Sequence, residues 1–250
     1  MNDIIDISYG FGYDSKSYDY KFVSIFSETD SYGCSAADIY TLRSDSWKKR
    51  CYGFPCKLSN GQPGVFLTGA LHWFAKSCMN GKRFILSFDL EEETSKELLL
   101  PAEHLDHFDY EFLDVLRGFL CLLCSVSNVK FEIWEMKDYG VRESWSKLFK
   151  IDQQQLMTMS IGIQSCHYIK RAVSLRNGEI LLEIMAKGQS YGKWRVDIVR
   201  IHLEEKKGCE YMKNIDQMEP YVESFVSLNS GTFVGNEEKD YGITVRDIWG

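Results

Sequence analysis

The sequence lacks the segments that direct a chain into or across a membrane. It has no N-terminal apolar stretch of the kind found in secretory signals and no apolar run long enough to span a bilayer. It also contains no Asn-x-Ser/Thr glycosylation site. We therefore expect neither secretion nor membrane insertion, and we predict a cytoplasmic protein that could also occupy the nucleus.

An extended cluster of positive charge is absent as well. The chain carries 29 Lys and Arg against 36 Asp and Glu, which is a formal net charge of −7. Surfaces that bind nucleic acid or anionic membranes normally show a basic stripe. The charge pattern therefore argues against both kinds of partner.

Signatures of phosphoryl transfer and zinc hydrolysis are missing. The sequence contains neither a P-loop nor a His-Glu-x-x-His motif. We expect no catalytic residue and no cofactor, and we predict that the chain is not an enzyme. The enzymatic alternative is a glycoside hydrolase, which needs two carboxylates about 5 to 10 Å apart. Asp89, Glu91 and Glu92 are the carboxylates considered, and they follow a strand end as turn charges do.

Metal-ligand spacing is also weak. Cys121 and Cys124 have CxxC spacing, but no second pair follows, and residues three apart on a strand point to opposite faces. The segment 103–114 (EHLDHFDYEFLD) is rich in His and carboxylates that could bind a metal, although such runs are more often solvated loops. We predict structural thiols in a reducing compartment and no bound metal.

The sequence is rich in short runs that alternate apolar and polar residues. Residues 115–151 show this best, with three runs separated by polar breakers: GFLCLLC (118–124), KFEIWEM (130–136) and SWSKLFKI (144–151). Such alternation is typical of half-buried antiparallel strands. We expect Trp73, Trp134 and Trp145 in the core, and His72, between Leu71 and Trp73, as a core or rim residue with satisfied hydrogen bonds.

The pattern recurs along the chain. A Gly-x-Leu/Ile run begins at Gly69, Gly118 and Gly178, and a second apolar run (IYTL, ILSF, IWEM, IVRI) begins at residues 39, 85, 133 and 198. The second runs are 46, 48 and 65 residues apart, and a longer loop at 188–193 explains the last interval. A period of about 40 to 50 residues is typical of propeller blades. We predict an all-β, antiparallel, β-propeller-like array of about four sheet repeats, with an ordinary β-sandwich as the alternative.

The same pattern sets the expected boundaries. Residues 1–230 are expected to form this domain, and residues 231–250 are expected to be a loosely ordered C-terminal tail. Within the domain we expect a short strand at 10–13, a longer joint with a helical turn at 152–164, and a closing strand at 221–229.

Several segments together resemble the F-box associated interaction domain of plant F-box proteins. They are GFGYDSKSYDYKFVSI, IYTLRSDSW, GALHWFA, ILSFDLEEE, GFLCLLC, IWEMKDYGVRESWSKLF and YVESFVSLN, and they extend over about residues 10 to 230. The family is kelch-like and includes the S-locus F-box proteins of pollen. The resemblance implies a β-propeller-like module that recognises a target protein for ubiquitination. Recognition in pollen self-incompatibility is a narrower form of that role.

The resemblance also sets an expectation about the N-terminus. In the family an F-box docks a Skp-type adaptor, and through it the cullin, of an SCF ubiquitin ligase. This chain begins close to the GFGYD segment, so we expect the F-box and the family's first sheet repeat to be missing. Contact with the adaptor is therefore not expected from this chain alone, and the array is expected to be incomplete at its N-terminus.

Aromatic residues in the expected loops are the candidates for partner contact, because Tyr offers a large amphipathic contact area. They are Tyr32, Tyr52, Phe54, Tyr110, Tyr139 and Tyr191. Each of them could instead pack on its own sheet. A non-catalytic propeller that binds a glycan or small ligand through such aromatics is the other alternative.

Overall fold

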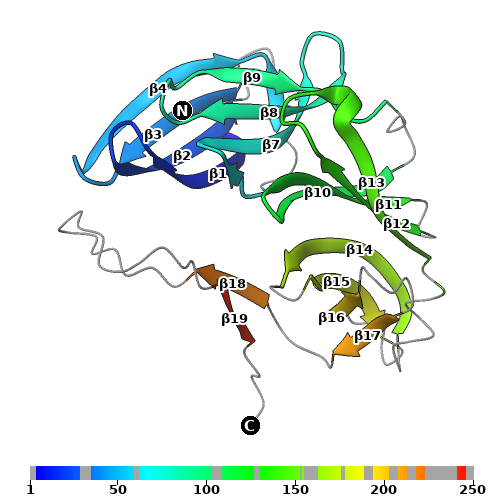
Figure 1. Cartoon of the computed structure of the whole chain (residues 1–250). Helices are drawn as coiled ribbons and strands as arrows, with labels where there is room; N and C mark the ends of the chain where they lie inside the picture. Colours follow the sequence, from blue (N-terminus) through cyan, green and yellow to red (C-terminus); the bar gives the residue numbers. More distant parts are fainter. Residues whose placement is uncertain are drawn as a thin grey trace. The chain divides into compact units, whose positions relative to one another are not determined.

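The structure is a computed structural model of the 250-residue chain (Figure 1). It describes residues 4–28, 35–58, 62–102, 108–126, 130–152, 154, 163–175, 178–188, 194–202, 208–212, 218–222 and 241–245. These residues form mainly β-strands and turns, with one short 3-10 helix, η1 (Arg142–Ser144). Within these ranges no helix has the length and apolar character needed to cross a membrane.

Four antiparallel strands form the first sheet, in the order β1-β2-β3-β4. They are β1 (Ile4–Asp14), β2 (Asp19–Glu28), β3 (Ser35–Thr41) and β4 (Ser46–Phe54). The register places Phe11 opposite Phe22 and Tyr13 opposite Tyr20. Because side chains alternate between faces along a strand, this register gathers the aromatic rings on one face.

The first strand is longer than the one expected at residues 10–13. Its pairing with β2 starts at Ile4 opposite Glu28, with an irregularity between Ile4 and Asp6, and continues to Asp14 opposite Asp19. From Ile7 onwards exposed and buried residues alternate strictly. The expected boundary was wrong because glycines at two alternate positions hide the apolar period on that side.

The second sheet has two short strands in place of one outer strand. It contains β5 (Cys56–Leu58), β6 (Val65–Leu67), β7 (Ala70–Ser77), β8 (Arg83–Asp89) and β9 (Ser95–Leu98). Both β5 and β6 pair with β7, at its two ends, and β7-β8-β9 continue the sheet.

The third and fourth sheets have four strands each. The third is β10 (Phe108–Leu116), β11 (Phe119–Val126), β12 (Lys130–Met136) and β13 (Trp145–Asp152). The fourth is β14 (Ile163–Ser174), β15 (Ile180–Gly188), β16 (Trp194–His202) and β17 (Gly208–Met212). In both, the strands are neighbours in the order of the chain.

The three repeat glycines occupy equivalent turns, as predicted. Gly69, Gly118 and Gly178 have φ values of 80°, 80° and 84°. Gly69 and Gly118 stand directly before β7 and β11, and Gly178 stands two positions before the first residue of β15. Thr68 and Arg117, which precede the first two, also have positive φ (47° and 53°). Positive φ at both central residues is the type I′ hairpin turn, whose twist matches that of the flanking strands.

The other repeat positions are equivalent too. The second apolar runs lie in β3, β8, β12 and β16. A bulky residue follows each run and lies in the next strand: Trp47 in β4, Leu98 in β9, Trp145 in β13 and Tyr211 in β17. Each of the four repeats is thus one antiparallel sheet. The predicted fold class, an all-β, β-propeller-like array of about four sheet repeats, is confirmed.

The chain divides into two compact units, which we describe separately. Unit 1 comprises residues 1–104, 118–120 and 136–145, and unit 2 comprises residues 105–117, 121–135 and 146–250. The core of unit 1 joins the first two sheets, and the core of unit 2 joins apolar residues of the third and fourth. Trp73, Trp134 and Trp145 are buried, as expected from their places on alternating strands.

Near the C-terminus a two-stranded sheet joins β18 (Met218–Val222) to β19 (Tyr241–Val245). β19 lies within the segment expected to be a loose tail. The expected closing strand at 221–229 begins within β18, while residues 223–229 lie outside the described residues. Most of the expected joint at 152–164 lies outside them as well.

Candidate interaction surface

The segment GFGYD folds as part of β1, with small residues on one side and aromatic rings on the other. Gly10 and Gly12 are buried, whereas Tyr9, Phe11 and Tyr13, which alternate with them along the strand, are exposed. This follows from the two-residue period of a strand. One side of β1 therefore packs on the protein interior and the other faces outward.

The buried side of β1 needs glycine because the second sheet approaches closely. A Cβ atom at Gly10 would lie 2.9 Å from Leu71 and Trp73, and one at Gly12 would lie 2.4 Å from Phe66 and 2.6 Å from Leu90. Contacts this short are not tolerated in packed interiors, so any other residue would push the sheets apart.

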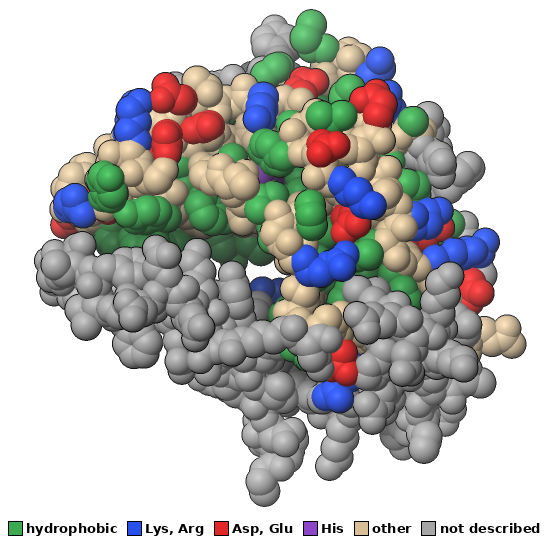
Figure 2. Space-filling model, in the orientation of Figure 1, with side chains coloured by type: hydrophobic (Ala, Val, Ile, Leu, Met, Phe, Trp, Pro, Cys, Tyr) green, Lys and Arg blue, Asp and Glu red, His purple; other side chains and the backbone are tan. Residues whose placement is uncertain are grey.

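The outward side of the first sheet carries two groups of contacting aromatic rings, which together we call the aromatic face. It consists of Tyr9, Phe11, Tyr13, Tyr20, Phe22, Tyr40 and Trp47. Tyr9, Phe11 and Trp47 are 47, 53 and 50% exposed. Figure 2 shows hydrophobic side chains gathered along the lower left of the described surface, over β1–β4.

The rings of the aromatic face pack against one another across the strands. Phe11 and Tyr20 are stacked at 5.3 Å with an interplanar angle of 4°, and Tyr9 and Phe22 are stacked at 6.1 Å. Trp47 meets Phe22 edge-on at 6.2 Å. Side chains stand roughly perpendicular to a sheet, so rings stacked on their neighbours present mainly their edges to solvent.

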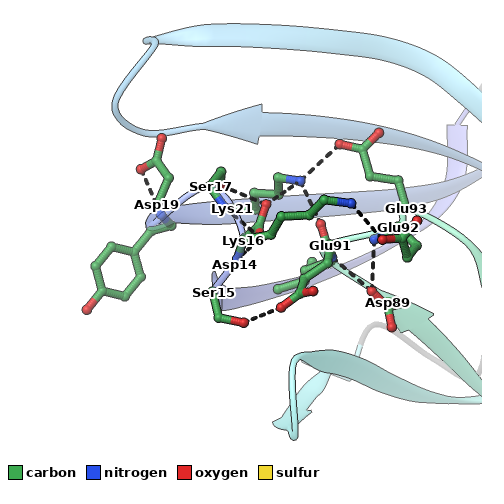
Figure 3. A network of polar contacts seen from close by, with 12 residues as sticks. Asp14, Ser15, Lys16, Ser17, Asp19, Lys21, Asp89, Glu91, Glu92 and Glu93 are labelled. Carbon is green, nitrogen blue, oxygen red and sulfur yellow. Dashed lines mark hydrogen bonds and ion pairs between the residues drawn. The ribbon is translucent and has the colours of Figure 1, made fainter.

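Polar contacts hold the turn after β1 to the turn after β8 (Figure 3). The ammonium group of Lys21 lies 2.9 Å from Asp14 and 3.1 Å from Glu93, and it donates to the carbonyl of Leu90 at 2.6 Å. Three acceptors therefore surround a buried cation that has three protons to donate. At the surface, Lys16 pairs with Glu92 at 2.7 Å.

These contacts set the charge states of the cluster. Burial by itself would raise the pKa of Asp14, but hydrogen bonds from Lys21 and Ser17 and the positive charge of Lys21 hold that pKa at about 2. Burial would likewise lower the pKa of Lys21, but its bonds to Asp14 and Glu93 raise it instead. Both groups stay ionised at neutral pH and form a structural pair.

A second polar group in unit 1 centres on Tyr139. Its hydroxyl lies 2.6 Å from Nε2 of His72 and 2.9 Å from Oγ of Ser87, and Nζ of Lys96 lies 4.7 Å from its ring centroid. Nδ1 of His72 lies 3.0 Å from the carbonyl of Val65, which can only accept, so Nδ1 carries the proton and Nε2 accepts from Tyr139. Burial lowers the pKa of His72 to about 4. The expectation of a satisfied core histidine is confirmed.

The six aromatic residues expected at a partner surface differ in their environments. Phe54 is 3% exposed, lies in β4 and meets Phe88 edge-on at 6.1 Å, so its interpretation as an exposed loop residue was wrong. Its position is buried because the alternation of β4 turns it toward the core of unit 1. Tyr139 is partly exposed, but its hydroxyl is engaged internally.

The remaining four candidates have no described side chain. Tyr52 lies in β4 and Tyr110 in β10, and their side chains are outside the described part. Tyr32 and Tyr191 lie outside the described residues altogether. Their expected role in partner contact stays a prediction.

The carboxylates considered for hydrolysis are occupied in a turn. Oδ1 of Asp89 accepts from the backbone N–H groups of Glu91 and Glu92, at 2.9 and 3.0 Å. Glu92 pairs with Lys16 and Glu91 accepts from Ser15. These contacts agree with the interpretation of the three acids as turn charges.

One catalytic-looking sequence pattern was missed. Residues 188–192 read Gly-Gln-Ser-Tyr-Gly, which matches Gly-x-Ser-x-Gly in letters. A nucleophile elbow requires a strand followed by a helix. Here β15 ends at Gly188 and pairs antiparallel with β16, which begins at Trp194, so the pattern lies in a hairpin connection.

Titratable groups in unit 2 serve the fold. Burial raises the pKa of the Cys121 thiol to about 12, which makes it an unreactive core residue. Burial also raises the pKa of Asp114 to about 6, although its carboxylate accepts from the N–H groups of Val115 and Ala172. Among the residues with described side chains, no group of three or more His, Cys, Asp or Glu is arranged to hold a metal.

The aromatic face itself was missed at the level of sequence. Its signal was present, because Ile7, Tyr9, Phe11 and Tyr13 alternate with Ser8, Gly10 and Gly12. Aromatic residues on alternating strands were expected to be buried, and only the packing of glycines against the second sheet shows which side of β1 faces inward.

Comparisons with known proteins agree on one family. Residues 2–228 match the family described as the F-box associated beta propeller domain. The F-box protein CPR1 of Arabidopsis thaliana is 29% identical over 200 residues, which cover 71% of this chain and 47% of that protein. An F-box/kelch-repeat protein of the same plant is 30% identical over 148 residues, covering 58% of this chain and 40% of that protein. The chain thus spans less than half the length of these two relatives.

A solved structure shares the fold at low identity. The endo-arabinase of Bacteroides thetaiotaomicron is 14% identical with a TM-score of 0.50, and the match covers 99% of this chain and 94% of that one. At this identity the likeness concerns the fold alone, because one fold hosts many unrelated functions.

Proposed function

Because the chain belongs to the F-box associated beta propeller domain family, we propose that it is the target-recognition region of a plant F-box protein. In that role it would hold a target protein for ubiquitination by an SCF-type ligase. The observation that carries the proposal is the family match over residues 2–228, nearly the whole chain. Contact with the Skp-type adaptor and cullin would come from an F-box.

The structure offers support of two kinds. The type I′ turns at Gly69 and Gly118 and the ion cluster around Lys21 fix connections between strands, and rigidly held loops lose little entropy on binding. The engaged state of Asp89 and Glu92 favours a binding role over hydrolysis. We place the protein in the cytoplasm or nucleus, where such ligases would meet their targets.

Two narrower points belong to the same proposal. Target contact would involve Tyr32 and Tyr191, together with Tyr52 in β4 and Tyr110 in β10, because exposed Tyr is favoured at interfaces. Recognition in pollen self-incompatibility is the specific form suggested by the resemblance to S-locus F-box proteins.

A fusion experiment tests the proposal. An F-box from an Arabidopsis relative is joined ahead of this chain, expressed in plant cells, and isolated with its adaptor. We expect proteins that co-purify with the fusion to be ubiquitinated, and we expect neither the F-box alone nor a Trp145→Ala fusion to ubiquitinate them. Ubiquitination that is equal with the F-box alone would overturn the proposal. Single Tyr→Ala changes at these four positions then locate the contact.

A further inference from the structure

We propose that two copies of this chain associate through the aromatic face of the first sheet. The proposal goes beyond target recognition and does not depend on it. It starts from the exposure of Tyr9 and Phe11 in β1 and of Trp47 in β4, each about half exposed; Phe22 in β2 and Tyr40 in β3 lie between these two edge strands. Ile7 and Leu42, 52 and 39% exposed, extend the apolar surface at its margins.

The apolar area lies toward the upper end of what an isolated molecule exposes. An aromatic side chain buries about 150 to 250 Å², so these residues and Tyr13 together expose on the order of 500 Å². The largest apolar patch of a typical monomer is roughly 300 to 600 Å², and larger ones usually mark interfaces. Two such faces would bury on the order of 1,000 Å², the lower end for a specific contact. We therefore expect association that depends on concentration.

The shape of the face suits another sheet. Its reverse side already packs on a sheet, since Gly10 and Gly12 receive Leu71, Trp73 and Phe66 from the second sheet. Sheet faces pack by interleaving the side chains of alternating positions. A second copy supplies such a face with matching spacing, and a two-fold arrangement lets the same residues meet on both sides.

The orientation of the rings argues against a carbohydrate as the ligand of the aromatic face. Sugars stack on ring faces, but Phe11 and Tyr20 cover each other at an interplanar angle of 4°. Ring edges carry the positive part of the quadrupole and pack well against aromatic faces and apolar side chains of a protein. The hydroxyls of Tyr9 and Tyr13 add polar groups that can hydrogen-bond at the rim.

Few acidic residues lie on the aromatic face, so local electrostatic repulsion between two copies is small. By the two-residue period of a strand, the positions of β1, β2 and β3 that share the aromatic face carry two acidic residues, Asp38, between Ala36 and Tyr40, and Glu28 at the end of β2. Repulsion would come mainly from the net charge of −7 on each copy, which acts over longer distances and is screened by salt.

Sedimentation velocity of the whole chain tests the proposal directly. We expect the mass to rise from 29.0 kDa toward twice that value as the concentration goes from the low to the high micromolar range. Phe11→Glu and Trp47→Glu place a charge on the face and should weaken association at least about tenfold. Met79→Glu is the control, because Met79 is 87% exposed in the turn after β7, away from this face.

Thermal unfolding followed by circular dichroism shows whether the variants keep their fold. A monomeric Phe11→Glu or Trp47→Glu with an unchanged unfolding temperature, beside a dimeric Met79→Glu, supports the contact. If wild type stays monomeric throughout, or if folded Phe11→Glu and Trp47→Glu dimerise as wild type does, the proposal is wrong.

Discussion

His72 is a titratable residue with no exposed surface and with both ring nitrogens engaged. Its folded pKa of about 4 lies below the usual 6.5 because burial disfavours the charged imidazolium, and Lys96 adds to the effect. The folded state therefore binds fewer protons than the unfolded state. Its contribution to stability is complete above pH 6.5 and is lost as the pH falls toward 4.

We predict that His72→Gln flattens the acid limb of the stability curve. Wild type should lose roughly 3 kcal/mol through His72 between pH 6.5 and 4, at about 1.4 kcal/mol per pKa unit, and the variant should not. Urea unfolding at several pH values measures this. Asp114 has a raised pKa, so its own contribution to the stability of the protein is lost as the pH rises toward 6. The effect of His72 is therefore read from the difference in unfolding free energy between His72→Gln and wild type at each pH.

Tyr139→Phe is the matched control, since it removes the hydroxyl that donates to His72 but keeps the titrating ring. It should be less stable than wild type while showing a similar pH slope. If the unfolding free energy of wild type and of His72→Gln changes with pH equally, the pKa of His72 does not differ between the folded and unfolded states, and the prediction is wrong.

The tryptophans provide a second comparison at single residues. Trp145 is 8% exposed and its indole N–H donates to the carbonyl of Leu99 at 2.9 Å, whereas Trp47 is 50% exposed. We predict that Trp145→Ala costs about 3 to 5 kcal/mol of unfolding free energy, as large core truncations do. Trp47→Ala should cost well under half as much. Denaturant melts at low protein concentration, below any association, measure both, and similar losses would contradict the assigned burial.

At the scale of elements, β1 shows how a strand can join one sheet to another. Its glycines admit the second sheet, and its rings face outward, so one segment serves two surfaces. We predict that Gly12→Ala destabilises the protein by about 1 to 3 kcal/mol, because its Cβ would lie 2.4 Å from the ring of Phe66.

Gly118 provides the contrast for this change. It has positive φ, but a Cβ atom at this position would have no other atom within 4 Å. Glycine is therefore favoured here by the backbone conformation and not by close packing. Gly118→Asn should cost little, because Asn tolerates this region, whereas Gly12→Asn should cost at least as much as Gly12→Ala. Chemical unfolding ranks the variants, and a harmless Gly12→Asn would disprove the tight approach of the two sheets.

At the scale of the whole molecule, net charge and the aromatic face act in opposite directions. Each copy carries −7, so the copies repel one another at low salt, while the proposed contact is apolar. We predict that raising NaCl from about 0.05 to about 0.5 M strengthens self-association, because screening removes repulsion without weakening apolar contact. Sedimentation at both salt concentrations measures this, and weakening by salt would indicate a contact built from ion pairs instead.

The family resemblance also extends over most of the chain. The matched relatives are F-box proteins of Arabidopsis, and the chain spans less than half the length of the first two. The sequence segments that carried the resemblance, such as GFGYD and IWEMKDYGVRESWSKLF, are the ones that form β1 and the connection from β12 to β13. The same residues therefore indicate both the family and the sheet repeat.

The repeat can be predicted from the amino-acid sequence because hairpin turns and the alternation of apolar and polar residues are local features. The recurring Gly-x-Leu/Ile runs and the spacing of the second apolar runs predict one sheet per repeat, and the structure places Gly69 and Gly118 in the turns before β7 and β11. The tertiary structure decided which face of each strand is inside. Phe54 and Phe11 both lie on alternating strands, yet one is buried on Phe88 and the other is exposed. That difference depends on which sheet packs against which face, and residues distant in the chain, such as Phe66 and Leu71 beside β1, decide it.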